Sequence, residues 1–261
     1  MSYELIPGAP GSPVLLHVPH GARDIPRDVR AELLPDDRAL GRELDHITDA
    51  HTPEIAGRAA ARAPVRPWRF VNRLSRLVVD PERFPDEREE MLAAGMGAVY
   101  TRTTHREPLR PEPFPGTSAL VGTYFEPYAE AVARAVDERL AACGRAVVLD
   151  VHSYPTRPLP YELHGTGERP PVCLGTDAFH TPDALVRQAR DAFDGLGGTA
   201  LDTPFAGTYV PLRHHRRDPR VQALMIEIRR DVYMAEPGGD PTAGLDAVAA
   251  ALAGLVAAQT P

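Results

Sequence analysis

Two histidines that directly follow apolar runs are the first residues in this sequence with an obvious chemical use. His20 comes shortly after Val14–Val18, and His152 comes directly after residues 146–151. In an open α/β sheet, ligands bind in the crevice at the carboxyl ends of the strands. Two histidines at such strand ends can hold one metal ion, whereas a single histidine there more often caps or packs a strand. The pair therefore predicts a metal site.

A carboxylate is the expected third ligand, because a catalytic zinc usually has three protein ligands and one open position for water. Residues 43–51 offer Asp45 and Asp49, which lie four residues apart and share a face if the segment is helical. Acidic residues at a helix N-terminus, placed favourably against the helix dipole, would explain either aspartate without a metal. The residues alone leave the choice between Asp45 and Asp49 open.

Glu227 is a single charged residue inside the apolar stretch 224–228. A buried carboxylate costs free energy unless it is paired or used. At a strand end beside a metal-activated water it is suited to act as general base, with a pKa set by burial and by the cation. The alternative is a structural salt bridge to Arg229 or Arg230.

Two arginines bracket a short apolar run and indicate an anionic substrate. Arg76 precedes residues 77–79, and Arg83 follows them. An arginine fork binds a carboxylate through two parallel hydrogen bonds, so these two side chains are candidates for substrate binding. The Arg- and His-rich run 213–217 is interpreted as an exposed loop.

These side chains require a sheet to position them. Four continuous apolar runs are predicted as strands: residues 14–18, 77–79, 146–151 and 223–228. Continuous rather than alternating apolar runs are typical of a parallel sheet covered on both faces.

Helical patterns lie between and after these runs. They cover residues 127–143, which Gly144 closes, residues from Asp183 toward Phe193, and residues from Asp240 to about Ala258. Alternation of strands and helices predicts an α/β fold with a doubly wound, mostly parallel sheet in a single domain over residues 1–261.

The composition excludes several classes of function. The chain has 43% hydrophobic and 25% charged residues and a net charge of −7, which argues against a nucleic-acid partner. It contains no lysine, so a Schiff-base mechanism is excluded.

We find no signal peptide pattern and no apolar segment near the ~20 residues that span a membrane, so we expect a cytoplasmic protein without a membrane partner. Motifs for nucleotide binding and serine hydrolysis are absent, and the oligomeric state stays open.

Six segments together resemble the N-formylglutamate amidohydrolase (N-formylglutamate deformylase) family. They occur in the family's order and extend from about His17 to Arg230: residues 18–21, 45–49, 75–83, 149–153, 203–209 and 226–229. No single segment is specific, but the ordered set is. The chain departs from the family pattern at Gly21-Ala22, where the family has Ser-Gly, and at Glu82, where it has Asn.

The resemblance implies a fold similar to the zinc carboxypeptidases and phosphorylase/hydrolase-like proteins. It further implies a zinc ion, or another divalent metal, held by His20, His152 and a carboxylate, with Asp45 preferred. Glu227 would be the general base. Arg76 and Arg83 would face the carboxylates of a glutamate-like substrate.

The expected activity is hydrolysis of the amide of an N-acyl amino acid, such as N-formylglutamate, by a metal-activated water. Tyr209 lies on a glycine-containing loop, where its hydroxyl could hydrogen-bond the oxyanion of the reaction. Packing of the ring within the loop explains this tyrosine equally well. Two alternatives stay open: a related deacylase or carboxypeptidase acting on another carboxylated substrate, and a non-catalytic protein that binds a carboxylated metabolite.

Overall fold

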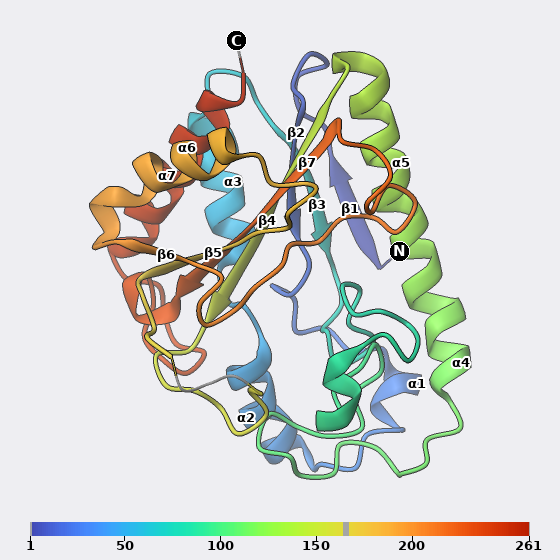
Figure 1. Ribbon diagram of the computed structural model, residues 1–261. Coiled ribbons are helices and arrows are strands. Elements are labelled where there is room, and N and C mark those ends of the chain that lie inside the picture. Colours follow the sequence, from blue (N-terminus) through green and yellow to red (C-terminus); the bar gives the residue numbers. More distant parts are fainter. Residues whose placement is uncertain (1, 164–166, 261) are drawn as a thin grey trace.

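A seven-stranded mixed sheet runs through the molecule (Figure 1). The computed structural model describes residues 2–163 and 167–260. Within them, the strand order is β1-β3-β2-β4-β7-β5-β6. The strands are β1 (Tyr3–Ile6), β2 (Val14–Val18), β3 (Trp68–Asn72), β4 (Ala146–Tyr154), β5 (Val172–Gly175), β6 (Thr199–Leu201) and β7 (Val221–Arg229).

The centre of the sheet is parallel and its flanks are mixed. Strand β2 pairs in parallel with β3 and β4, and β4 pairs in parallel with β7. Strand β1 runs antiparallel to β3, and β5 runs antiparallel to β7 but parallel to β6. The predicted α/β fold with a mostly parallel sheet is confirmed.

Three of the four predicted strands form, and one does not. Residues 14–18 match β2, and the predicted runs at 146–151 and 223–228 lie inside the longer β4 and β7. Residues 77–79 instead lie in a turn after β3, although Leu77 and Val78 are fully buried. Burial in the small cores beneath the loops explains the apolar character of this run without a strand.

The helices cover both faces of the sheet. They are α1 (Arg27–Arg30), α2 (Asp37–Ile47), α3 (Thr52–Arg62), α4 (Thr117–Leu120), α5 (Glu126–Cys143), α6 (Asp183–Phe193) and α7 (Gly244–Ala258). Helix α5 ends at Gly144, which has a left-handed φ of 73° and closes the helix as predicted. Helix α6 begins at Asp183 as predicted, whereas α7 begins at Gly244, later than Asp240.

Helices α3, α6 and α7 lie on one side of the sheet, and α5 lies on the other (Figure 1). Strand β4 shows why its sequence is continuously apolar. Val147, Leu149 and Val151 pack into the core beneath α3, α6 and α7, and the alternate residues Ala146 and Val148 pack toward α5. All five are fully buried. A strand buried on both faces needs apolar residues at every position.

Helices α1 and α2 gather at one end of the sheet, in the lower part of Figure 1. This is the end toward which β2 and β4 run, so the chain segments after these strands meet there.

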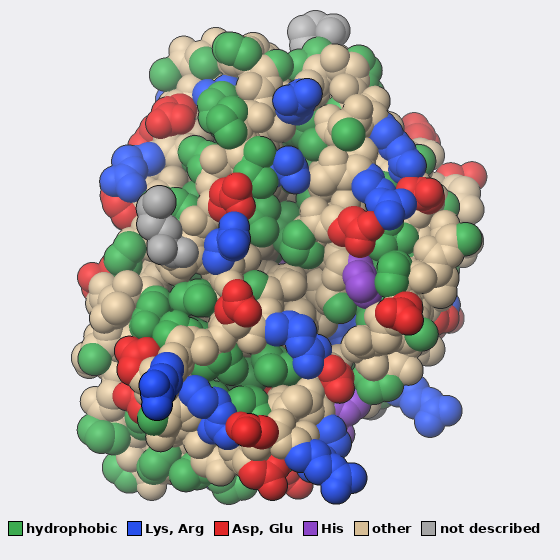
Figure 2. Space-filling model, turned by 180° about the vertical axis from the view of Figure 1, so that it is seen from behind, with side chains coloured by type: hydrophobic (Ala, Val, Ile, Leu, Met, Phe, Trp, Pro, Cys, Tyr) green, Lys and Arg blue, Asp and Glu red, His purple; other side chains and the backbone are tan. Residues whose placement is uncertain are grey.

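On the face shown in Figure 2, arginine and acidic side chains are interspersed and form no continuous basic patch. Among the described residues, no helix has the length and apolar character needed to cross a membrane.

Candidate active site

Three buried side chains converge at the carboxyl ends of β2 and β4. His20 follows β2, His152 lies within β4, and Asp49 lies in the connection between α2 and α3. The Nδ1 atoms of His20 and His152 are 3.2 Å apart. Asp49 Oδ2 lies 3.2 Å from His152 Nδ1 and 3.7 Å from His20 Nδ1. The Asp49 backbone N–H donates to the His20 carbonyl oxygen at 3.0 Å, which fixes this connection beside the end of β2.

These distances suit a tetrahedral metal ion. Ligand atoms about 2.0–2.1 Å from a zinc ion are separated from one another by about 3.3 Å. The three separations of 3.2, 3.2 and 3.7 Å are close to this value. Three ligands on one side of such an ion leave a fourth position open for water or substrate.

The far side of each imidazole ring faces a carboxylate. His20 Nε2 is 2.9 Å from Asp80 Oδ1, and His152 Nε2 is 3.0 Å from Asp150 Oδ2. A carboxylate there favours the tautomer with the proton on Nε2 and leaves the Nδ1 lone pair free. Both Nδ1 lone pairs then point at the same place, as two metal ligands require. The donor set therefore fits a divalent cation.

Glu227 lies on β7 directly beside His152 of β4 in the sheet register. Burial raises the pKa of the Glu227 carboxyl to about 7, although His152 opposes the shift. Its Oε2 atom is buried and has no hydrogen-bond partner among the described residues. A carboxyl group with a pKa near neutrality, next to a metal site, has the properties of a general base.

The three converging residues and Glu227 line one deep cavity of about 730 Å³. Segments after β2, β3, β4 and β6 form its wall. Its charged lining residues are the acidic Asp49, Asp80, Glu82, Glu89, Glu90, Asp150, Glu162, Asp202 and Glu227, and the basic Arg76, Arg83, Arg88 and Arg230. The cavity lies where an open α/β sheet binds its ligands.

The family model of N-formylglutamate amidohydrolase matches residues 12–234. The chain belongs to the N-formylglutamate amidohydrolase family. The resemblance drawn from the six ordered segments is thereby confirmed. Membership identifies the chain as an amidohydrolase, a hydrolase of carbon–nitrogen bonds other than peptide bonds.

Two solved structures share the fold of this family member. One is an N-formylglutamate amidohydrolase from Ralstonia eutropha JMP134, with a TM-score of 0.80 and 20% sequence identity, covering 98% of this chain and 95% of that chain. The other is a gene product of Agrobacterium tumefaciens, with a TM-score of 0.71 and 19% identity, covering 98% of this chain and 93% of that chain. No curated protein matches the sequence significantly.

The structure separates the two aspartates between which the sequence could not choose. Asp49 lies against both histidines, whereas Asp45 lies outside the cluster and pairs with Arg23 at 2.8 Å. Helix α2 ends at Ile47, so the two aspartates do not share a helical face. Asp45, the aspartate preferred as third ligand from the sequence, lies outside this cluster, and Asp49 is the aspartate that lies against both histidines.

Arg76 and Arg83 both line the cavity, but their surroundings differ. Arg76 donates to Asp80 Oδ2 through Nη2 at 2.6 Å and to the Tyr100 hydroxyl through Nε at 3.0 Å. Arg83 lies 3.5 Å from Asp80 and 3.5 Å from Glu89 and makes no hydrogen bond among the described residues. Arg83 is thus the more available of the two for a ligand carboxylate.

Tyr209 lines the cavity and stacks on His17, with ring centroids 4.7 Å apart. His17 lies on β2, where its Nδ1 is 2.9 Å from Asp150 and 3.3 Å from Glu82. Burial opposes the charged form of His17, but hydrogen bonds with Asp150 and Glu82 outweigh it and raise the pKa of His17 to about 9. Glu82, one of the departures from the family pattern, thus has a buried histidine as its partner.

Several residues that contact the candidate ligands had no role predicted from the sequence. Arg230 donates to Asp49 Oδ1 at 3.2 Å and to the His46 carbonyl oxygen at 2.6 Å, so it is not the salt-bridge partner of Glu227. Arg76 and His20 hold the pKa of Asp80 well below its usual range, although burial alone would raise it. Asp150 had a readable signal, since it precedes His152 by two residues in a strand and so faces the same side.

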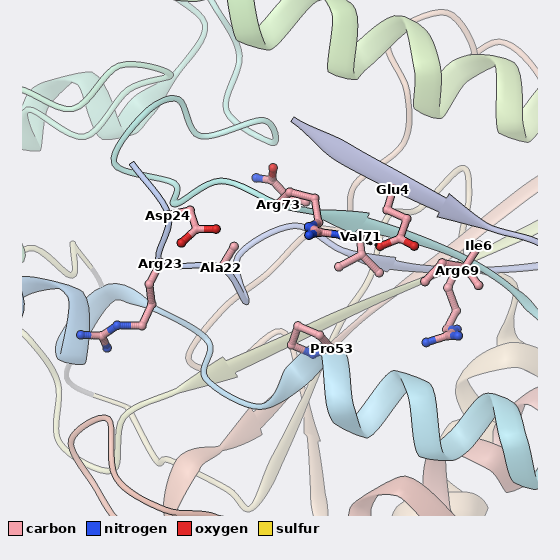
Figure 3. Close-up of a pocket in the computed structure, with 10 residues that line it drawn as sticks. Glu4, Ile6, Ala22, Arg23, Asp24, Pro53, Arg69, Val71 and Arg73 are labelled. Atoms are coloured by element: carbon pink, nitrogen blue, oxygen red, sulfur yellow. Dashed lines mark hydrogen bonds and ion pairs between the residues drawn. The ribbon is translucent and has the colours of Figure 1, made fainter. Parts of the chain in front are cut away.

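A second, shallower hollow of about 330 Å³ lies beside β1 and β3 (Figure 3). Arg23, Arg69 and Arg73 line it, together with Glu4, Pro53 and neighbouring residues. Glu4 and Arg73 pair across it at 2.8 Å, and both side chains are about half exposed. Among the described groups that could hold a metal ion, none includes a residue of this hollow.

Proposed function

We propose that this family member is a metal-dependent amidohydrolase that cleaves the amide bond of an N-acyl amino acid. The observation that carries the proposal is the convergence of His20, Asp49 and His152 beside Glu227. Two imidazole nitrogens and a carboxylate are the ligands of many catalytic zinc sites, which makes zinc the first metal to test. The name of the Ralstonia eutropha structure suggests N-formylglutamate as a first substrate.

A divalent metal held by His20, Asp49 and His152 would supply Lewis acidity that favours ionisation of water and polarises the amide carbonyl. Glu227 accepts a proton from the attacking water. The water oxygen bonds to the carbonyl carbon, and the carbon–nitrogen bond breaks. Glu227 returns the proton to the departing nitrogen, which leaves a carboxylic acid and an amine.

The other cavity residues bind and orient the substrate. Arg83 binds a substrate carboxylate through its guanidinium group and sets the position of the amide relative to Glu227. Arg76 is fixed by Asp80 and contributes positive charge near the same place. The Tyr209 hydroxyl donates a hydrogen bond to the oxygen that becomes negative as the carbonyl is attacked.

The proposal is tested by metal content and turnover in one preparation. We expect about one divalent ion per chain by plasma mass spectrometry, and release of formate from N-formyl amino acids. Chelation should abolish turnover, and one equivalent of zinc should restore it. Failure to bind any divalent metal, or metal binding without turnover of any N-acyl amino acid, would contradict the proposal. The second result would favour a protein that only binds a carboxylated metabolite.

A further inference from the structure

The charge of the cavity is unfavourable for a substrate with two carboxylates. Nine acidic side chains and four arginines line it, and a divalent metal ion would offset only two of the five excess negative charges. Among partners just outside the lining, Arg169 beside Glu162 and Asp86 beside Arg88 cancel each other. His17, whose pKa is raised to about 9, adds one positive charge beside Asp150 and Glu82, and the balance stays negative. Charges in a partly enclosed cavity are weakly screened by water, so a dianion such as N-formylglutamate is repelled more strongly than a monoanion.

Of the two arginines predicted to bind substrate, one is available for a substrate carboxylate. Arg76 has its Nε and Nη2 atoms bound to Asp80 and Tyr100. Arg83 is the one of this pair whose guanidinium makes no hydrogen bond among the described residues. Its fork matches one carboxylate, which every N-acyl amino acid carries on its α-carbon.

The mouth of the cavity combines apolar with charged side chains, and the exposed Arg88, Glu90 and Asp202 are the charged ones. Leu163 and Leu212 line it with 40% and 42% of their surfaces exposed, and they are two of five large hydrophobic side chains that are exposed in the described part of the chain. The Phe84 ring also lines the mouth. It is held between the Arg88 guanidinium, 4.8 Å from the ring centroid, and the His215 ring at 6.3 Å. Large apolar side chains exposed at the mouth of a cavity are suited to bind an apolar group of a ligand.

We infer that the preferred substrate is an N-acyl amino acid with an uncharged, apolar side chain. The inference rests on the proposed amide hydrolysis and narrows its substrate. Arg83 binds the α-carboxylate, and the side chain lies against Phe84 and Leu212 at the mouth. The cavity volume of about 730 Å³ leaves ample room, since it falls within the ~300–1,000 Å³ typical of sites for ligands larger than a single amino acid.

Three substrates of nearly equal length distinguish the effect of side-chain charge on turnover from the effect of side-chain apolarity. N-formylglutamate carries a second carboxylate, N-formylglutamine replaces it with a neutral amide, and N-formylmethionine replaces it with an apolar thioether. With the metal-loaded protein, we expect kcat/KM to rise in that order. The methionine compound should exceed the glutamate compound by roughly tenfold or more, as expected for a few methylene-sized contacts in a pocket.

Two leucine variants test whether the preference for an apolar side chain depends on Leu212 at the mouth of the cavity. Leu212→Ser should lower kcat/KM for N-formylmethionine by roughly three- to tenfold and leave the glutamine compound nearly unchanged. Leu34→Ser is the control, because Leu34 is 55% exposed and is not part of the cavity lining. It should change neither value.

The outcomes distinguish the inference from the proposed function. A kcat/KM for N-formylglutamate equal to or above that for N-formylmethionine would overturn the inference and leave the amidohydrolase proposal intact. Equal losses on all three substrates in Leu212→Ser would also overturn it. No turnover of any of the three by the metal-loaded protein would overturn the proposed function and this inference together.

Discussion

The cavity at the carboxyl ends of the strands and the hollow beside β1 and β3 both contain arginines next to carboxylates, yet they differ in burial. In the cavity, the paired Arg76 and Asp80 side chains are 12% and 0% exposed. In the hollow of Figure 3, the paired Glu4 and Arg73 side chains are about half exposed. The same residue types therefore operate in two different electrostatic environments.

A functional site is therefore recognised by convergence and burial of its side chains rather than by residue type. Charges buried together interact strongly and shift one another's pKa values, whereas exposed pairs are screened by water and salt. Asp45 illustrates the point. It has the right chemistry for a ligand but pairs with Arg23, which lines the hollow. Asp49, four residues later, lies in the cavity.

The largest expected effect comes from exchanging these two aspartates for asparagine. Asp49→Asn removes an anionic ligand between two histidines, so we expect loss of the bound metal and turnover at background. Asp45→Asn removes only an exposed ion pair and should leave both unchanged. Metal content and turnover of the two variants, measured side by side, check the assignment. Loss of metal in Asp45→Asn alone would reverse it.

Glu227→Gln should reduce turnover by a factor of about 10²–10⁴ while leaving the metal in place. The amide keeps the size of the side chain but cannot accept the proton of water. Metal analysis of the same preparation distinguishes the two roles open to this residue. If the metal is lost with the carboxylate, Glu227 is a ligand and the base lies elsewhere.

Arg83→Ala tests whether an arginine in the cavity contributes to substrate binding while an arginine in the hollow does not. Removing a guanidinium that binds a substrate carboxylate should raise KM by about ten- to a hundredfold, because such hydrogen bonds contribute about 1.5–3 kcal/mol. Arg69→Ala is the matched control, since the Arg69 side chain lines the hollow and makes no hydrogen bond among the described residues. Steady-state kinetics on one N-acyl amino acid suffices. Equal effects in the two variants would mean that Arg83 does not contact substrate.

The centre of the fold could be predicted because its sequence is governed by burial alone. Strands β2, β4 and β7 are apolar at most positions. His20 follows β2, and His152 and Glu227 lie near the carboxyl ends of β4 and β7, so the three residues could be found from these strands. Strand β3, Trp-Arg-Phe-Val-Asn, and the short β5 and β6 lie nearer the edges and carry weaker patterns. Their pairing depends on partners distant in the chain, which no local window contains.

The aspartate that lies beside the two histidines could not be predicted for a similar reason. Local spacing treats Asp45 and Asp49 alike, and only the end of α2 at Ile47 separates them. The position of Asp49 depends on its backbone bond to His20 and its side-chain bond to Arg230, residues far away in sequence. The roles of Asp80 and Glu82 likewise depend on a turn that was predicted to be a strand.

His17, which lies behind the cavity wall against Asp150 and Glu82, predicts a dependence of stability on pH. Its pKa is raised from 6.5 in the unfolded chain to about 9 in the folded protein. Between these values the folded state holds a proton that the unfolded state has released, so stability is full below pH 6.5 and declines as the pH rises through 9. The decline should reach at most about 3 kcal/mol.

This effect is measured by urea unfolding of chelator-treated protein at several pH values between 6 and 10, for the native chain and for His17→Gln. His152 titrates in the same cluster, so the informative quantity is the difference between the two curves. The native protein should lose more stability over this range than the variant. Parallel curves would show that His17 is not protonated in the folded state.

The smallest effect is expected in the hollow, at the ion pair between Glu4 and Arg73. Its side chains are 50% and 58% exposed, and exposed pairs contribute about 0–1 kcal/mol because water and side-chain entropy offset the attraction. Glu4→Gln should therefore change the free energy of unfolding by less than about 1 kcal/mol, and the change should shrink in 1 M salt. Turnover should be unaffected. A larger loss of unfolding free energy that does not depend on salt would mean that this pair is effectively buried. The hollow and the cavity would then differ in their candidate metal ligands rather than in the exposure of their charged side chains.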